Sequence, residues 1–208
     1  MKLNRRRFLG VAGLGSAGLI IAPATAIPRV LTAGIREAEP TLLTRARAAF
    51  DRHASVVRHR DVMGIVDFAE PSHAARFHLV DFTNGKVATY LVAHGRGSDP
   101  TNKGWVEQLS NRPGSHASCA GSFLTGETYI GRHGRSRRLA GLDPENDLAA
   151  ARAIVIHAAR YVDDSLALSH GRIGRSHGCF AVSQGDISEV LERLGPGRML
   201  FAAKPATP

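Results

Sequence analysis

The hairpin predicted between residues 75 and 94 sets the kind of fold to expect. The segments ARFHLVDF (75–82) and VATYLVAH (87–94) alternate apolar with polar residues, and an Asn84–Gly85 turn lies between them. Alternation on both sides of an Asn-Gly pair is typical of two antiparallel strands. Short runs of the same β-type recur along the chain, at residues 63–68, 121–131, 137–142, 153–159 and 198–203. The sequence therefore predicts a mainly β domain.

Two other segments have helical spacing. Residues 40–58 place apolar side chains near a 3.6-residue period, which predicts an amphipathic helix on the outside of the domain, with His53 and His59 in solvent. Residues 183–194 predict a short helix opened by a Ser183/Asp186 capping pair. Long loops rich in Gly and Arg fill the gaps, and in a compact domain such loops usually build a site; they are residues 94–105, 111–121 and 169–178.

Residues 1–26 have the pattern of an export signal peptide. Basic residues precede a short apolar run, which ends at Pro23 ahead of an A-x-A cleavage site at residues 24–26. The pair Arg5–Arg6 followed by Phe8–Leu9 resembles a twin-arginine signal, although the general secretion route also uses basic residues ahead of an apolar run. We expect residues 1–26 to be removed, with no stable membrane insertion afterwards, and the mature chain to reside in the periplasm or cell envelope.

The charge of the expected mature chain is modest. Residues 1–26 hold four of the 27 Lys and Arg and none of the 18 Asp and Glu, so 23 basic residues remain against 18 acidic ones. This excess of five suits a protein near anionic wall polymers. It does not indicate nucleic-acid binding, because the basic residues are not interleaved with aromatic ones. A mature length of 182 residues is suited to one domain with a substantial core.

The segment GRSHGCFAV (174–182) raises the question of what Cys179 does. The chain has one other cysteine, Cys119, and two cysteines in an oxidising compartment allow a single disulfide. Alternatively, Cys179 is a nucleophile, which requires a nearby base to remove its proton. His177 precedes it by two residues, and His157 ends the apolar run AIVIH. The residues by themselves leave both interpretations open.

A family resemblance favours the nucleophile. The segment IHAARYVDDSLALSHGRIGRSHGC (156–179) resembles the active-site signature of the YkuD-type L,D-transpeptidases, in which a histidine precedes an S/T-H-G-C motif. The blocks VAHGRGSDP, NRPGSHAS, TGETYIGRHGRSRRLAGL, IVIHAA and HGRIGRSHGC resemble those of the murein subfamily, in the same order. The resemblance implies a catalytic domain at 62–203 after an N-terminal helical segment at 27–61. The implied fold is an L,D-transpeptidase-type mixed β-sandwich, mostly antiparallel, with the amphipathic helix before it and the short helix after the active-site loop.

The resemblance also implies roles for single residues. Cys179 matches the nucleophile, and His157 matches the general base, oriented by the backbone carbonyl of Ala158. His177 and Gly178 match positions whose imidazole and backbone N–H groups hold the thiol and the developing oxyanion, while Ser176 fixes the loop. The chain departs from the wider family at Ala181, where Asn or Arg is usual, and from the murein subfamily at His177, where Trp is frequent. The loop between His157 and Ser176 is also longer than the general pattern.

Other residues are weaker candidates. Arg172 and Arg175 have the geometry to bind stem-peptide carboxylates, and His170 to line the cleft, although each is equally suited to a solvated loop. Three further histidines in glycine-rich loops lack the spacing of a zinc site; they are His94, His116 and His133. We interpret Cys119 as a buried residue rather than a disulfide partner.

These expectations define a function. By resemblance, the chain is a periplasmic cysteine acyltransferase that joins peptidoglycan stem peptides in 3-3 cross-links through a thioester, without metal or cofactor, and is an expected target of carbapenem acylation. An L,D-carboxypeptidase or cross-link hydrolase with the same nucleophile is the alternative. A non-catalytic wall-binding protein with a Cys119–Cys179 disulfide is another, and a metal-dependent peptidase is a more distant one.

Overall fold

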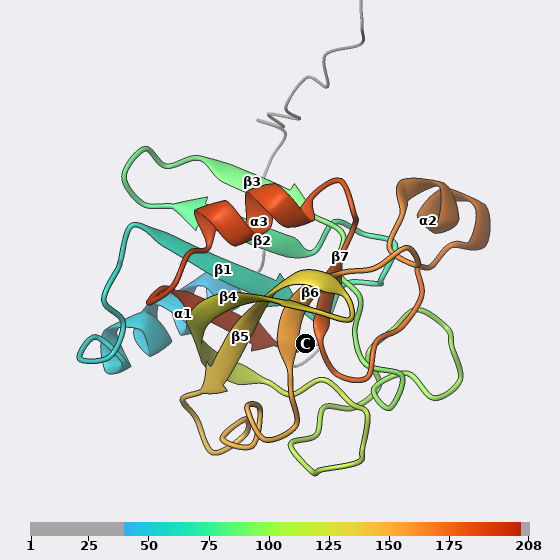
Figure 1. Ribbon diagram of the computed structural model, residues 1–208, viewed down its shortest axis with the longest axis horizontal. Helices are drawn as coiled ribbons and strands as arrows, with labels where there is room; N and C mark the ends of the chain where they lie inside the picture. Colours follow the sequence, from blue (N-terminus) through green and yellow to red (C-terminus); the bar gives the residue numbers. More distant parts are fainter. Residues whose placement is uncertain (1–39, 205–208) are drawn as a thin grey trace, which may run out of the picture.

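The computed structural model describes residues 40–204, which form a strongly curled sheet with helices around it (Figure 1). The strands are β1 (Val62–Asp67), β2 (Phe77–Asp81), β3 (Val87–Tyr90), β4 (Gly121–Gly131), β5 (Gly134–Gly141), β6 (Val155–Ala158), β7 (Phe180–Val182) and β8 (Met199–Ala203). The helices are α1 (Pro40–Arg52), α2 (Asp164–His170) and α3 (Ile187–Arg193).

All eight strands belong to one mixed sheet in the order β3-β2-β1-β8-β4-β5-β6-β7. The pairs β1/β8 and β6/β7 are parallel, and the other neighbours are antiparallel. An isolated antiparallel bridge joins Ala93, just after β3, to Ala181 in β7. The two edges of the sheet therefore meet. The prediction of a mainly β, mixed fold is confirmed, and its two layers are parts of one sheet that curls back on itself.

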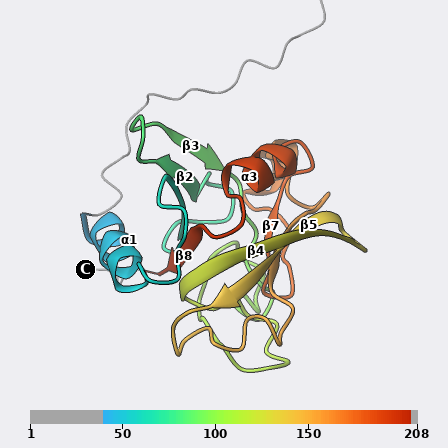
Figure 2. The same cartoon turned by 60° about the vertical axis from the view of Figure 1, so that its left-hand side comes forward.

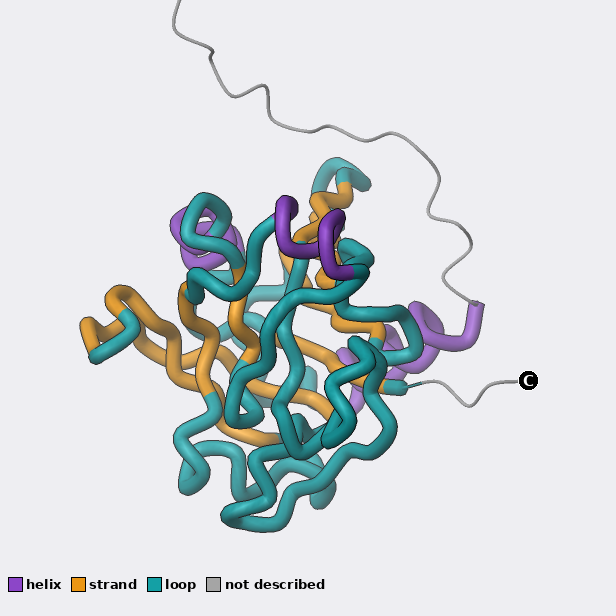
Figure 3. The backbone as a smooth tube through the Cα atoms, turned by 90° about the vertical axis from the view of Figure 1, so that its right-hand side faces the viewer, coloured by secondary structure: helices purple, strands orange, loops and turns teal. Residues whose placement is uncertain are grey.

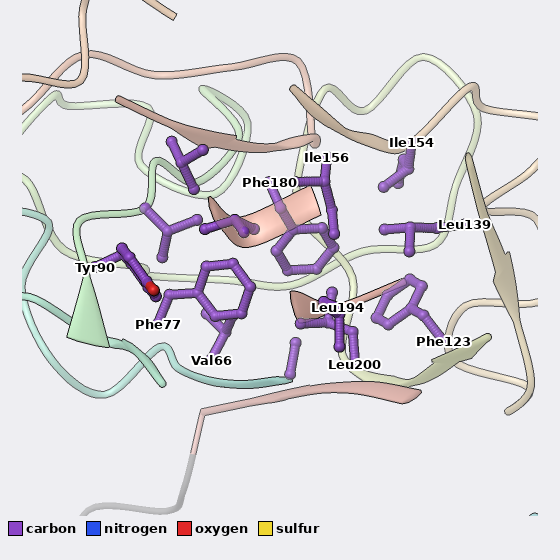
Figure 4. Close-up of a cluster of buried hydrophobic side chains, with 14 of the residues drawn as sticks. Val66, Phe77, Tyr90, Phe123, Leu139, Ile154, Ile156, Phe180, Leu194 and Leu200 are labelled. Atoms are coloured by element: carbon purple, nitrogen blue, oxygen red, sulfur yellow. The ribbon is translucent and has the colours of Figure 1, made fainter. Parts of the chain in front are cut away.

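The main core fills the inside of this curl (Figure 4). Alternate residues of β1 show how the sheet is buried on both faces. Val62 and Val66 point into the main core, whereas Met63 and Ile65 face a second apolar cluster that α1 covers from outside (Figure 2). The amphipathic pattern of α1 thus buries Leu42, Ala46, Ala49 and Phe50 against the sheet.

The structure corrects several element boundaries. Helix α1 ends at Arg52 rather than at 58, because the chain turns there and carries Val57 into the outer cluster. His53 is not a solvated histidine: its Nε2 lies 2.8 Å from Asp143 Oδ1. Ser183 and Asp186 do bond to each other, but α3 begins only at Ile187.

Two elements went unpredicted. Helix α2 has sequence features that indicate its ends, because Asp163 caps it through Ser165 N–H and Gly171 closes it in the left-handed conformation. Strand β7 has three residues and no alternation of its own. None of the helices in residues 40–204 is long and apolar enough to cross a bilayer. The predicted export signal lies outside the described residues and stays a prediction.

Candidate active site

The pairing of β6 with β7 brings His157 close in register to Cys179, which directly precedes β7. In this parallel pair His157 lies opposite Ala181, two residues beyond Cys179. Cys179 directly precedes β7 and is therefore close to His157 in register, while Ile156 and Phe180, which pair with each other, point into the main core.

His157 is held by its own backbone. Its Nδ1 lies 2.8 Å from the carbonyl oxygen of Ala158, and because a carbonyl only accepts, Nδ1 carries the proton and Nε2 has the free lone pair. The residue is 2% exposed. Burial lowers the pKa of His157, and the nearby His133 and Arg132 lower it further. The hydrogen bond to the Ala158 carbonyl raises this pKa but does not cancel the other effects. The imidazole is thus kept in its neutral form.

Cys179 carries a free, partly exposed thiol at the entrance to β7. Its Sγ contacts the carbonyl oxygen of Ala153 at 3.6 Å, and within residues 40–204 no hydrogen bond joins it to His157. Burial raises the pKa of the thiol. The N–H of Val155 and the charges of Arg152 and Arg132 oppose this without cancelling it.

Ser176 and Gly178 fix the conformation of the loop before Cys179. Ser176 Oγ accepts from Gly178 N–H at 3.0 Å and donates to the carbonyl of Cys179 at 2.7 Å. Gly178 has φ +112°, and a Cβ there would lie 2.7 Å from the carbonyl oxygen of Ala117. Ser176 thus fixes the turn, and the Gly178 N–H is engaged inside the loop rather than directed at a ligand.

His177 points outward at the rim. Its exposed ring lies 4.5 Å from the ring of His116, at an angle of 56° between the planes. Desolvation lowers the pKa of His177, and the charges of Arg96, His116 and Arg132 add to the effect.

Neighbouring loops hold the Cys179 loop from behind. Ser176 N–H bonds to the carbonyl of His94, Arg96 N–H bonds to the carbonyl of Ser176, and Ser118 Oγ accepts from Gly95 N–H at 3.0 Å. A Cβ on Gly95 would lie 2.3 Å from the carbonyl oxygen of His116, so the backbones touch. Figure 3 shows how much of this side of the molecule consists of loops.

A buried polar network anchors the 94–105 loop. Arg76 donates from Nη2 to His94 Nδ1 at 2.7 Å, and His94 Nε2 lies 3.3 Å from Asp99 Oδ2. Asp99 also accepts from the backbone N–H groups of Lys103 and Gly104. All three side chains are at most 1% exposed. His94 is thus part of the scaffold beneath the site.

The three predicted substrate-binding residues lie on the α2 side of the site. Arg175 donates to the carbonyl of Asp99, so part of its guanidinium is used within the protein. His170 and Arg172 line a shallow hollow of about 150 Å³ with Tyr161 and Leu166. These two are the better placed to meet a ligand, and their role stays a prediction.

Ala181 and Cys119 are both buried. Ala181 packs with Leu91, Ala93 and Ile173, so a side chain at this position has no access to a ligand. Cys119 is a free thiol in the main core, and burial raises its pKa to about 11. Residues 40–204 contain no group of three or more His, Cys, Asp or Glu arranged to hold a metal ion.

Sequence reasoning did not place Arg132 and His133 beside His157, and it considered His133 only as a zinc ligand. The ring of His133 stacks on His157, with centroids 4.2 Å apart and planes at 22°. Arg132 donates from Nε to His133 Nε2 at 3.1 Å. The pair lies in the turn between β4 and β5, and only the pairing of strands shows that this turn reaches His157.

Comparison with known proteins identifies the family. The model of the L,D-transpeptidase catalytic domain matches residues 35–203. Among solved structures, the chain is similar to three mycobacterial proteins, each over 69% of its length. They are an L,D-transpeptidase from Mycobacterium smegmatis (13% identity, TM-score 0.42, 58% of that chain), L,D-transpeptidase 1 from Mycobacterium tuberculosis (13%, 0.38, 61%) and L,D-transpeptidase 3 from Mycobacterium tuberculosis with a faropenem-derived adduct (12%, 0.43, 60%).

The chain spans about 60% of the length of these three structures. No curated protein sequence matches it. The family match covers α1, the whole sheet and the loop that carries Cys179. The chain belongs to the L,D-transpeptidase catalytic-domain family.

Proposed function

We propose that this chain is a cysteine acyltransferase that forms 3-3 cross-links between peptidoglycan stem peptides in the periplasm. One observation carries the proposal. A partly exposed thiol, Cys179, directly precedes β7, and β7 pairs with the strand that carries a buried neutral imidazole, His157, oriented by the Ala158 carbonyl.

The first half-reaction transfers the stem peptide to sulfur. Cys179 Sγ turns from the Ala153 carbonyl toward His157, whose Nε2 takes the thiol proton as sulfur attacks the carbonyl of the third stem residue. The tetrahedral intermediate then collapses, and His157 returns the proton to the departing amine of the terminal D-alanine. The product is a thioester on Cys179.

The second half-reaction releases the product. An amine of a second stem attacks the thioester carbonyl, His157 takes the amine proton, and sulfur leaves and regains a proton. Water in place of the amine gives an L,D-carboxypeptidase or a hydrolase with the same nucleophile. Arg172 and His170 line the hollow beside the site and are our candidates to contact the stem peptides.

The test is product analysis with purified protein and disaccharide-tetrapeptide. We expect mass spectrometry to show a cross-linked dimer that has lost one D-alanine, and no product with Cys179→Ala. Cys119→Ala is the matched control, because it removes the other, buried thiol. Cleaved monomer without any dimer overturns the transferase and leaves the hydrolase.

A second measurement separates catalysis from wall binding. Imipenem is expected to acylate the protein once, on Cys179, which intact-mass analysis and peptide mapping detect. A quantitative Cys119–Cys179 disulfide with no acylation would instead support the non-catalytic wall-binding protein.

A further inference from the structure

The turn between β4 and β5 is built next to His157 by strand register. Gly131 pairs with Gly134, which leaves a two-residue turn of Arg132 and His133. Strand β5 then pairs antiparallel with β6 so that Ser136 lies opposite His157. His133, the nearer of the two turn residues, therefore lies only three residues before the partner of His157, and Figure 1 shows this end of the β4–β5 hairpin passing over β6.

The stack adds a restraint that the Ala158 hydrogen bond does not supply. That bond fixes one edge of the imidazole, Nδ1, but does not by itself fix the tilt of the ring plane. The ring of His133 lies nearly parallel over the His157 ring at 4.2 Å. The two contacts together define both the edge and the plane of the ring, and hence where Nε2 points.

Arg132 fixes the tautomer of His133 and adds to the effect of burial on the pKa of both rings. Its Nε–H donates to His133 Nε2, so that nitrogen is an acceptor and the proton of neutral His133 sits on Nδ1. A second proton on His157 would place a cation against His133 and near the guanidinium of Arg132. Both His133 and Arg132 lower the pKa of His157, and Arg132 also lowers the pKa of Cys179 and of His177.

We propose that Arg132 and His133 are positioning residues for the general base: His133 holds the plane of the His157 ring by stacking, and Arg132 fixes the tautomer of His133 and holds a positive charge beside the ring pair. This rests on the proposed function for its consequence in catalysis. The geometry assigns to this turn, residues 132 and 133, a role in orienting His157 for proton transfer.

The stacking is tested with His133→Ala and His133→Phe in the full chain. We expect His133→Ala to slow acylation by imipenem about 10-fold to 100-fold, the range for a misplaced reacting group. His133→Phe keeps an aromatic ring and is expected to restore most of that rate. A rate for His133→Ala equal to wild type, or for His133→Phe no better than for His133→Ala, overturns the stacking role.

The charge effect is tested with Arg132→Gln, and with Arg135→Gln as the matched control on the same hairpin. Arg135 is exposed, and its charge acts on Arg137 rather than on the site groups. We expect the NMR titration of the His157 ring, and the acid limb of acylation, to move to higher pH in Arg132→Gln only. Equal titrations in the two variants overturn the proposal.

The titration also separates this proposal from the proposed function. It measures His157 directly and needs no turnover. If the wild-type protein neither cross-links muropeptides nor reacts with imipenem, the proposed function fails. The NMR comparison of Arg132→Gln with Arg135→Gln still decides whether Arg132 lowers the pKa of His157.

Discussion

At the residue scale, the thiol and the imidazole are both held in their neutral forms. Burial raises the pKa of Cys179 and lowers that of His157. A preformed thiolate–imidazolium pair would need the opposite shifts. In the mechanism we propose, the thiolate therefore forms as the substrate is attacked, with His157 taking the proton in that step, and the reactivity of Cys179 depends on where Nε2 points.

This assignment predicts the pH dependence of acylation. Since the pKa of His157 lies below the ordinary imidazole value of about 6.5, more than half of the base is neutral at that pH. We expect the rate constant for imipenem acylation to remain above half of its plateau at about pH 6.5 and to reach its midpoint only at lower pH. Rates measured by intact-mass spectrometry between about pH 4.5 and 8 give the midpoint. A midpoint of the acylation rate above about pH 6.5 would contradict a neutral His157 beside a neutral Cys179 thiol.

Gly178 is a second prediction at this scale. A side chain there needs a positive φ and meets the Ala117 carbonyl, so Gly178→Ala is expected to cost about 1–3 kcal/mol of folding free energy. Acylation is expected to fall about 100-fold as Cys179 shifts. The control is Gly185→Ala, where a Cβ meets only Ser183 Oγ at 3.7 Å. Urea unfolding and acylation rates are measured for both variants. Equal losses of stability and of rate in Gly178→Ala and Gly185→Ala would refute this interpretation of the loop.

At the scale of elements, alternation and turn residues predicted the strands well. The run 121–131 coincides with β4, and the hairpin predicted around Asn84–Gly85 contains β2 and β3, although β3 ends at Tyr90 rather than at 94. Short elements were not predicted. The three residues of β7 form a strand because they pair with β6 and bridge to Ala93, and they have no pattern of their own.

The candidate site divides in the same way. The resemblance picked out Cys179 and His157, of which His157 lies in β6 and Cys179 directly precedes the paired strand β7. It could not show Arg132 and His133 beside them, because their approach depends on the register of β5 against β6. It also could not show that Gly178 N–H is taken by Ser176.

Helix α1 is the element whose attachment is most open to test. Phe50 is 6% exposed, stacks on Phe82 at 5.6 Å and packs in the outer cluster. We expect Phe50→Ala to lower the free energy of unfolding by about 3–5 kcal/mol. Val56→Ala, at a position 42% exposed, is expected to change it by less than about 0.5 kcal/mol. Urea denaturation measures both, and a small effect of Phe50→Ala would mean that α1 contributes little to the domain.

At the scale of the whole molecule, curling of the sheet brings together the loops that carry the site, which are the 94–105 loop and the loop before Cys179. The bridge between Ala93 and Ala181 closes the curl, and directly beyond it Ser176 exchanges backbone hydrogen bonds with the 94–96 segment. The buried Arg76–His94–Asp99 network lies under that junction. His94 thus follows the bridging residue Ala93, supports the Cys179 loop through its carbonyl, and joins the buried network through its side chain.

That histidine makes stability depend on pH. Burial and the charge of Arg76 lower the pKa of His94 to about 4, although Asp99 opposes them and Arg175 adds to them. Its unfolded value is about 6.5. Between about pH 6.5 and 4 the unfolded chain therefore binds a proton that the folded chain does not, and the free energy of unfolding falls as pH falls, by up to about 1.4 kcal/mol per unit.

The variant His94→Gln isolates this effect. Glutamine accepts from Arg76 and donates to Asp99 through its amide, yet it does not titrate. Other histidines with lowered pKa values, such as His78 and His157, contribute equally to both proteins. Urea unfolding across about pH 4–7 should therefore show that wild type loses its advantage over His94→Gln as pH falls through this window. A difference that stays constant from about pH 6.5 to 4 would show that His94 does not carry the pH dependence of the fold.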